Sequence, residues 1–226
     1  MPLRPFSATY FTYDDGDRLG FLAALLSLTP VFVMVSYATL IASRPDCHTI
    51  TLVTGQLANE VLNYVLKHAL KQPRPGGERD HVPKYGMPSN HAQFAFFAAV
   101  YTVLWAARRW QAAWVVRVAT VAAALVGATA VCAARVYLGY HSLAQVGVGA
   151  AVGSAAAAAW YYVTELLLRP HFAAIVRLPL ARALFLRNSG PCAHVLRVEY
   201  DAVMAAGAAA STAVPVPRSP QRAKVQ

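Results

Sequence analysis

Charged residues are scarce in this chain of 226 residues, and acidic ones are the scarcest. Only 13% of the residues are charged, with 10 Asp and Glu against 20 Lys and Arg, whereas 57% are hydrophobic. An ordinary globular domain carries about 25% charged residues, and disorder requires low hydrophobicity. The composition therefore argues against a soluble or disordered chain and predicts one basic membrane domain.

Cysteine is rare as well, with Cys47, Cys132 and Cys192 the only three in the chain. They are odd in number, lie far apart and stand in no CxxC or Cys/His ligand spacing. This pattern predicts neither a disulfide framework nor a zinc site. Glu78 and Asp80 form a close acidic pair in a Gly-rich loop, and we interpret them as solvated rather than metal-binding.

Long uncharged apolar runs are the main feature of the chain. Leu19–Ala42 contains no charge and is long enough for a helix to cross a hydrocarbon core of about 30 Å. Pro30 is expected to kink this helix. The segment before it is long and acidic, unlike the short basic start of a cleaved signal peptide, so we interpret the run as the first membrane span.

Four more apolar runs follow, and the first of them has a polar side. They are Thr49–Leu66, Ala92–Ala107, Trp114–Ala134 and Leu143–Leu168. At helical spacing Glu60, Asn63 and Lys67 fall on one side, which should face the protein interior because polar groups are costly in lipid. The last run is rich in Gly and Ala and is expected to pack closely against other helices. The predicted fold class is all-α, a polytopic membrane helix bundle of about five spans.

With five spans, the polar loops alternate between the two sides of the membrane. The loop between Lys67 and Asn90 shares one side with the junction from Ala134 to His141, and the basic tail after Arg169 lies on the other. The positive-inside rule places that tail in the cytoplasm, which puts the two polar loops and the N-terminus outside or in a lumen. The positive charge of the first polar loop opposes this rule, and we discount it because functional cations override topology statistics.

The chain is thus expected to contain four parts. These are a lumenal N-terminal segment (1–18), the membrane domain (19–168), a basic segment that is interfacial or an ordinary solvated tail (169–204), and a disordered tail (205–226). The disorder of the last part is predicted from its low complexity.

Six side chains suited to phosphate chemistry are predicted to meet on one side of the membrane. They are Lys67, Arg74, Ser89, His91, Arg135 and His141. Arginine offers a planar fork to phosphate oxygens, lysine a compact charge, and serine with helix-start N–H groups further donors. Two histidines can divide the roles of nucleophile and general acid. The pattern indicates a phosphate or pyrophosphate site that performs phosphoryl transfer without a metal.

Each of these residues also has an ordinary structural interpretation. Basic residues at span ends commonly anchor a helix beside acidic lipids, and Ser89 fits a helix N-cap. His68 and His81 stand in no pattern and are assigned to this ordinary class. Arg135 and His141 are harder to explain in this way, because both stand at the same apolar-helix boundary.

Three segments resemble the signature of the type 2 phosphatidic acid phosphatase superfamily, which reads KxxxxxxRP, PSxH and SRxxxxxHxxxD. Lys67 to Pro75, Pro88 to His91 and Arg135 to His141 follow it in the same order. The wording LKQPRP, YGMPSNHAQF and ARVYLGYHSLAQV is similar to the dolichyl-diphosphatase branch, which acts on a polyisoprenoid diphosphate in the endoplasmic reticulum. The resemblance covers about residues 57–149.

The resemblance implies a role for each matching residue. Lys67, Arg74 and Arg135 hold the phosphoryl oxygens. His141 attacks phosphorus to form a phosphohistidine, and His91 protonates the leaving oxygen. The substrate-binding set is completed by Pro75, Ser89, Asn90 and Gln145. The resemblance further implies a multi-pass membrane enzyme that recycles the lipid carrier of N-glycosylation, with a lumen-facing site, no cofactor or metal, and no nucleic-acid partner.

Two positions depart from the signature. Ala134 stands where the superfamily has serine, which removes one possible hydrogen bond to phosphate. Gln145 stands where it has aspartate. One helical turn beyond His141, this amide can still accept the ring N–H but brings no full charge. The dolichyl branch is similar in having glutamine there, so this second departure favours the branch over an inactive protein.

Three other functions stay open on the sequence. The same chemistry could act on phosphatidate or another lipid phosphate, because the apolar residues do not identify the lipid. A noncatalytic protein could use the cationic pocket to bind or scaffold anionic lipids, which Ala134 and Gln145 favour. A transporter has less support, because the sequence has no internal repeat and no matched pair of broken helices.

Overall fold

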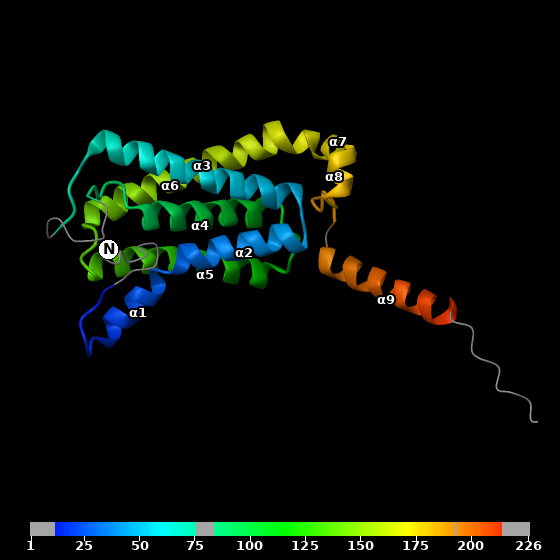
Figure 1. Ribbon diagram of the computed structural model, residues 1–226, viewed down its shortest axis with the longest axis horizontal. Helices are drawn as coiled ribbons and strands as arrows, with labels where there is room; N and C mark the ends of the chain where they lie inside the picture. Colours follow the sequence, from blue (N-terminus) through cyan, green and yellow to red (C-terminus); the bar gives the residue numbers. More distant parts are fainter. Residues whose placement is uncertain (1–11, 76–83, 193, 214–226) are drawn as a thin grey trace, which may run out of the picture. The chain divides into compact units, whose positions relative to one another are not determined.

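A computed structural model describes residues 12–75, 84–192 and 194–213, and within these ranges the regular structure is helical (Figure 1). Two isolated β-bridges accompany the helices, Asp46 with Arg187 and Pro73 with Tyr85. The long helices are α1 (Arg18–Leu26), α2 (Thr29–Ser43), α3 (Cys47–Leu70), α4 (Asn90–Arg108), α5 (Trp114–Tyr137) and α6 (Leu143–Val163). The predicted all-α class is confirmed.

The first apolar run forms two helices instead of one kinked helix. α1 ends at Leu26 and α2 begins at Thr29, so Ser27 and Leu28 lie between them. Pro30 occupies the first turn of α2, where a residue without an N–H is tolerated. The N–H groups of Val31 and Phe32 bond to the carbonyl of Leu28. The carbonyl of Ser27 is therefore not used by the start of α2.

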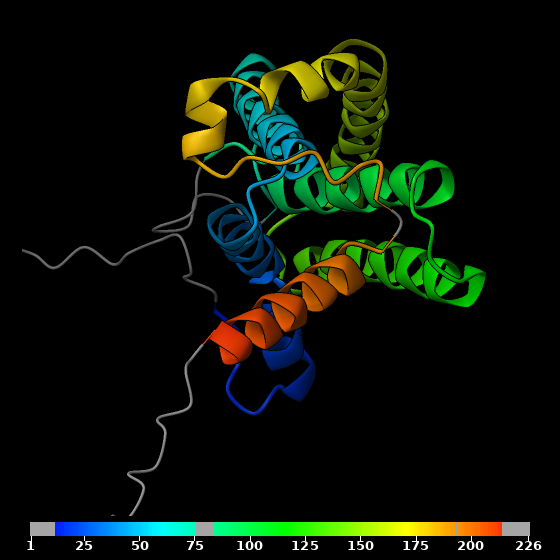
Figure 2. The ribbon, with the colours of Figure 1, turned by 90° about the vertical axis from the view of Figure 1, so that its right-hand side faces the viewer.

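Helix α4 lies at the centre of the bundle. Figure 2 shows it below α3 and α6 and above α5. On the α6 side, Phe97 and Tyr101 pack with Ala157 and Tyr161. On the α5 side, the packing consists of alanines and one valine: Ala95, Ala99, Ala128 and Val131. Small residues on the α5 side let the two backbones approach closely.

Helices α4 and α6 make direct backbone contact through glycine. A Cβ atom on Gly149 would lie 2.7 Å from the carbonyl oxygen of Ser89, and one on Gly153 would overlap the carbonyl of Gln93. The two glycines are four residues apart, so they share one face of α6. The close packing expected from the Gly- and Ala-rich sequence is confirmed, and it places the start of α6 against the start of α4.

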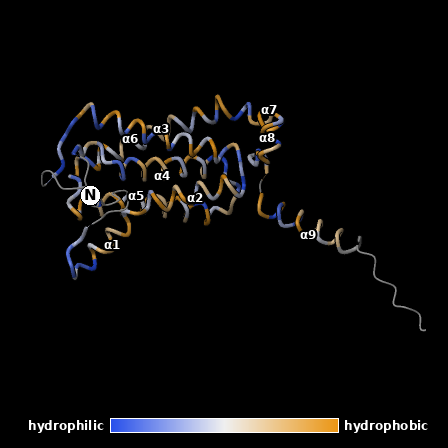
Figure 3. The backbone as a smooth tube through the Cα atoms, in the orientation of Figure 1, coloured by the Kyte–Doolittle hydropathy of each residue, from blue (hydrophilic) through white to orange (hydrophobic). Residues whose placement is uncertain are grey.

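Three helical stretches of the described residues are long and apolar enough to cross a membrane. They are Arg18–Ser43, Trp114–Tyr137 and Leu143–Ile175, with mean hydropathies of 2.1, 2.0 and 1.4. Their hydrophobic residues are coloured orange in Figure 3. Helices α3 and α4 have 24 and 19 residues but carry buried polar side chains, which lowers their hydropathy. The count of five spans stays a prediction.

The residues after α6 continue as short helical pieces: η2 (Thr164–Leu168), η3 (Arg169–His171), α7 (Phe172–Ile175) and α8 (Pro179–Ala183). The end of this segment is attached to the start of α3. Asp46 accepts the N–H of Ser189 at 2.8 Å, and Arg187 bonds through its main chain to Pro45 and Cys47. Residues 169–191 are therefore an attached part of the first unit.

The second unit runs from Cys192 and contains α9 (Val195–Ala213). The units separate after Pro191, and the expected boundary after residue 204 stays a prediction. The disorder expected from Ala205 is wrong as far as Ala213, because alanine has the highest intrinsic helix propensity and dominates this stretch. Residues 214–226 of the expected tail, and 1–11 of the expected N-terminal segment, lie outside the described residues.

Gly149→Ala should lower the phosphatase activity that the resemblance implies by about tenfold or more. The added Cβ would overlap the backbone of Ser89 and shift the start of α4, and small displacements at a reacting site are costly. Gly147→Ala is the matched control, because nothing lies within 4 Å of its Cβ position. Phosphate release by the two variants, at equal membrane insertion, is the measurement. Equal activities would contradict the role of this contact.

Two C-terminal truncations should differ in their effect on thermal stability. Ending the chain after Pro191 removes only the second unit, so activity and thermal midpoint should be retained. Ending it after Arg169 also removes the residues that bond to Asp46 and Cys47, so the midpoint should fall. Thermal unfolding in detergent measures both. Equal midpoints would show that the attachment contributes nothing to stability.

Candidate active site

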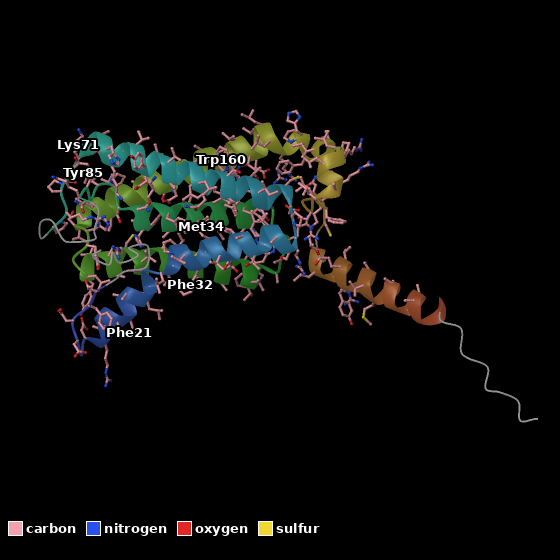
Figure 4. All side chains as sticks on the ribbon, viewed as in Figure 1. Phe21, Phe32, Met34, Lys71, Tyr85 and Trp160 are labelled. Carbon is pink, nitrogen blue, oxygen red and sulfur yellow. The ribbon has the colours of Figure 1, made fainter. Side chains whose placement is uncertain are left out.

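The predicted site residues come from four segments that meet at one end of the first unit. These segments are the end of α3 with the loop after it, the start of α4, the end of α5 with the loop after it, and the start of α6. Lys71 and Tyr85, labelled in Figure 4, mark this end. A backbone hydrogen bond from Gly86 to Gln72, 2.8 Å long, closes the loop between α3 and α4. The structure thus brings together the segments that the sequence motifs pick out.

His141 is buried, and its ring has a hydrogen-bond partner at each nitrogen. It lies in the loop between α5 and α6 and is 3% exposed. Its Nδ1 is 3.1 Å from Oε1 of Gln145, whose Nε2 donates to the carbonyl of Pro73 at 2.8 Å. Because that carbonyl can only accept, Oε1 is the amide atom that faces the ring. Nδ1 therefore carries the proton, and the lone pair lies on Nε2.

The lone pair on Nε2 of His141 faces Arg74. The Nη1 atom of Arg74 is 3.0 Å from Nε2 and 3.0 Å from the carbonyl oxygen of Tyr140. Burial, reinforced by Arg74 and Arg135, lowers the pKa of His141 to about 2. The imidazole is thus neutral at physiological pH, which is the form in which a histidine nitrogen can act as a nucleophile. The lone pair on Nε2 is occupied as long as Arg74 donates to it.

Ser89 presents an unused hydroxyl to the site. It is 0% exposed, and its Oγ has no hydrogen-bond partner among the described residues. It occupies the N-cap position of α4, as the structural interpretation expects, but its side chain makes no capping hydrogen bond. Its N–H donates to the carbonyl of Gln145 at 3.0 Å, which fixes its position. A buried hydroxyl of this kind is suited to donate to a phosphoryl oxygen, because unpaired buried polar groups are costly.

Asn90, the first residue of α4, is arranged in a similar way. Its Oδ1 is buried and has no hydrogen-bond partner within the described ranges. Hydrogen bonds among three side-chain amides connect the start of α4 to α3. Asn63 donates to Oε1 of Gln93 at 2.8 Å, and Gln93 donates to Oδ1 of Asn59 at 2.8 Å. The polar side of α3 faces the interior, as predicted.

His91 is oriented by the break between α1 and α2. Its Nε2 lies 3.1 Å from the carbonyl oxygen of Ser27. A carbonyl oxygen only accepts, so this nitrogen carries a proton. Sequence reasoning missed Ser27, which belongs to none of the three motifs.

Arg135 and Lys67 complete the cationic part of the site. Arg135, in the last turn of α5, is 4% exposed and lies 4.2 Å over the ring of Tyr140. Its Nη1 is 3.1 Å from Oγ of Ser27. Lys67, in the last turn of α3, interacts electrostatically with both Arg74 and Arg135. Three mutually repelling cations favour a multiply charged anion between them.

The remaining predicted residues either have structural contacts away from the site or lie outside the described ranges. His68 bonds through Nδ1 to the carbonyl of Tyr64 at 2.8 Å, and its ring lies against the Tyr64 ring at a tilt of 40°, so its structural assignment agrees with its contacts. His81, Glu78 and Asp80 lie outside the described residues. Pro75 follows Arg74 at the edge of the described loop. Within the described ranges, no three His, Cys, Asp or Glu side chains gather at one point.

The chain is similar in sequence to several phosphatases. Residues 48–169, more than half of the chain, match the PAP2 superfamily. Dolichyldiphosphatase 1 of Mus musculus is 37% identical over 213 residues, which cover 89% of each chain. Dolichyldiphosphatase of Saccharomyces cerevisiae is 35% identical over 170 residues, covering 72% of this chain and 71% of the yeast protein. Lipid phosphate phosphatase gamma of Arabidopsis thaliana is 32% identical over 213 residues, covering 90% and 92%.

A solved structure has the same fold. It is the crystal structure of the first transmembrane PAP2 type phosphatidylglycerolphosphate phosphatase, from Bacillus subtilis. The two structures superpose with a TM-score of 0.59 over 68% of this chain and 80% of the other, at 19% sequence identity. The fold and the family expected from the three motifs are thus confirmed together. This chain belongs to the PAP2 superfamily.

Proposed function

We propose that this protein is an integral membrane phosphatase that hydrolyses dolichyl diphosphate to dolichyl phosphate and phosphate. The observation that carries the proposal is the neutral, tautomer-fixed His141 beside Arg74 in a chain 37% identical to dolichyldiphosphatase 1 over 89% of its length. Arg135 and the unused hydroxyl of Ser89 support the same chemistry.

The reaction follows from the positions of these groups. Lys67, Arg74 and Arg135 hold the oxygens of the terminal phosphoryl group, and Ser89 donates to one of them. Nε2 of His141 attacks phosphorus, the bond to the bridging oxygen breaks, and a phosphohistidine forms. His91 acts in its doubly protonated form: its Nε2–H stays on the carbonyl of Ser27, and its Nδ1 gives a proton to the leaving oxygen, which departs as dolichyl phosphate.

The second half of the reaction releases phosphate. His91, having given up its proton, accepts one from water, and that water attacks the phosphohistidine. The bond between phosphorus and His141 breaks, and the electron pair returns to Nε2. Gln145 maintains the orientation of the His141 ring through both halves of the reaction by accepting the Nδ1 hydrogen. An amide stabilises the transient cationic ring less than a carboxylate would, yet it gives the same orientation.

We further propose a multi-pass location in the endoplasmic reticulum membrane with the site on the lumenal side. The positive-inside rule supports this orientation, because the segment after α6 is basic and lies at the opposite end of the first unit from the site loops (Figure 1). In that location the product returns a lipid carrier to N-glycosylation. Protease protection of an N-terminal epitope in sealed microsomes tests the orientation.

A second candidate is the same chemistry on another lipid phosphate. It is favoured by the relative named lipid phosphate phosphatase gamma, which is 32% identical over 90% of this chain. The noncatalytic lipid-binding scaffold is the remaining alternative. It accounts for Ala134 but not for the orientation of His141 by Gln145, which a binding site does not need.

Purified protein in detergent should release phosphate from dolichyl diphosphate faster than from phosphatidate, with EDTA present throughout. His141→Ala should lower this release by about a thousandfold or more, because the nucleophile is lost. Preference for phosphatidate would keep the chemistry and replace the substrate. No release from either lipid by the unaltered protein would favour the scaffold.

Gln145→Glu should move the acid limb of the pH-rate profile to higher pH. In the unaltered protein the lowered pKa keeps His141 neutral above about pH 4, so its protonation sets no limit near pH 7. A carboxylate beside Nδ1 favours imidazolium and raises the pKa, so activity is lost earlier as the pH falls. The profile of kcat/KM measures this. An unchanged acid limb would contradict the contact between Gln145 and His141.

A further inference from the structure

Ser27 lies at the site although it stands outside the sequence motifs and outside residues 48–169, which match the superfamily. It follows α1 directly and is 1% exposed. Its side chain and its main chain each contact a residue that has a role in the proposed mechanism. Its Oγ meets Arg135 and its carbonyl meets His91.

The hydroxyl contact has a fixed direction. Oγ of Ser27 donates its one hydrogen to the carbonyl of Ala23 at 2.9 Å. Its lone pairs are then the part that faces Nη1 of Arg135, which donates at 3.1 Å. A hydrogen bond from a buried cation to a fixed acceptor holds the guanidinium plane. The superfamily signature places a serine before this arginine, and here that position is Ala134.

The carbonyl contact depends on the helix break. In a continuous helix the carbonyl of Ser27 would accept from the N–H of Val31, which here bonds to Leu28. The oxygen accepts from Nε2 of His91 at 3.1 Å instead. A main-chain acceptor between two helices is rigid, so it fixes the plane of the His91 ring.

The segment that carries Ser27 is itself attached to α5. The hydroxyl of Tyr137 donates to Oδ2 of Asp17 at 3.0 Å, and the N–H of Thr12 donates to the hydroxyl of Tyr140 at 3.0 Å. Tyr140 is the residue whose ring stacks on Arg135. The N-terminal segment therefore contacts the surroundings of Arg135 at more than one point. These contacts restrain the position of the segment that carries Ser27.

We propose that Ser27 is a positioning residue for phosphoryl transfer. Its hydroxyl orients Arg135 toward the phosphoryl oxygens, and its carbonyl orients His91 toward the leaving oxygen. The inference rests on the proposed function for its kinetic consequence, while its consequence for anion binding does not depend on which lipid is the substrate.

The ordinary explanation is that the Ser27 hydroxyl only forms a hydrogen bond within its own helix, α1. Serines in helices commonly bond to the carbonyl four residues back. Ser36 makes that bond to Phe32 at 2.8 Å on the exposed side of α2. Ser36→Ala is therefore the matched control, because it removes the same local bond in the same apolar run without touching the site.

The first measurement is the affinity of the full-length protein in detergent for orthovanadate, a phosphate analogue, followed by its stabilisation against thermal unfolding. Ser27→Ala should weaken this affinity about tenfold relative to the unaltered protein, because Arg135 loses its fixed acceptor. Ser36→Ala should leave it unchanged. Equal vanadate affinities in the two variants would overturn the inference, whatever their activities.

A size-matched pair covers the case in which Ser27→Ala does not fold. Thr and Val differ by a hydroxyl at nearly equal volume, so any cost of the extra methyl is common to both. Ser27→Thr should bind vanadate about tenfold more tightly than Ser27→Val. Equal affinities in this pair would likewise overturn the inference.

The third measurement asks whether Ser27 acts through Arg135. In the unaltered background, Ser27→Ala should lower kcat/KM for dolichyl diphosphate about tenfold. In an Arg135→Lys background, which lacks the guanidinium fork, it should have little further effect. Additive losses would contradict the path through Arg135. If the unaltered protein binds vanadate but does not hydrolyse this lipid, the proposed substrate fails while the vanadate comparison still decides the role of Ser27.

Discussion

The organisation of the site depends on one residue, Gln145. Its side-chain oxygen holds Nδ1 of His141, its side-chain nitrogen holds the carbonyl of Pro73, and its main-chain carbonyl accepts the N–H of Ser89. Pro73 and Ser89 lie near the two ends of the connection between α3 and α4, and His141 lies in the loop before α6. An amide can donate and accept at the same time, which a carboxylate cannot do. The exchange of aspartate for glutamine therefore gives up charge on the histidine and gains a direct connection to the loop that carries Arg74.

Backbone proximity makes this connection possible. Gly149 lets α6 touch the main chain at Ser89, and Gly86 is close enough to Gln145 that a Cβ there would lie 2.6 Å from Oε1. The site is thus built from main-chain groups and short side chains, whose positions vary little because they have few rotatable bonds. Long cationic side chains are added to this frame from α3, α5 and the connecting loop. Such a division suits a reaction in which rigid donors and acceptors do the orienting and the cations stabilise the charge of the phosphoryl group.

The sequence was most informative where chemistry requires fixed residue types. The paired histidines, the arginines and the polar side of α3 could be predicted because polar groups are costly in lipid and therefore face the protein interior or a site. Ser27 could not be predicted, because a serine near a proline in an apolar run has many ordinary uses and its partners come from α4 and α5. The helix over 205–213 was misjudged for a related reason, since low complexity describes both disordered tails and alanine-rich helices.

The N-terminal segment differs from the C-terminal unit in its relation to the chemistry. Asp17 bonds to Tyr137 at the end of α5 and Thr12 bonds to Tyr140 in the loop after it, whereas α9 belongs to a unit separate from the one that holds the site. A purification tag or fluorescent protein joined at the N-terminus would be tethered to a segment that contacts the neighbours of Arg135. The same addition at the C-terminus would follow the separate unit, so that end is the better place for a label in any quantitative assay of this protein.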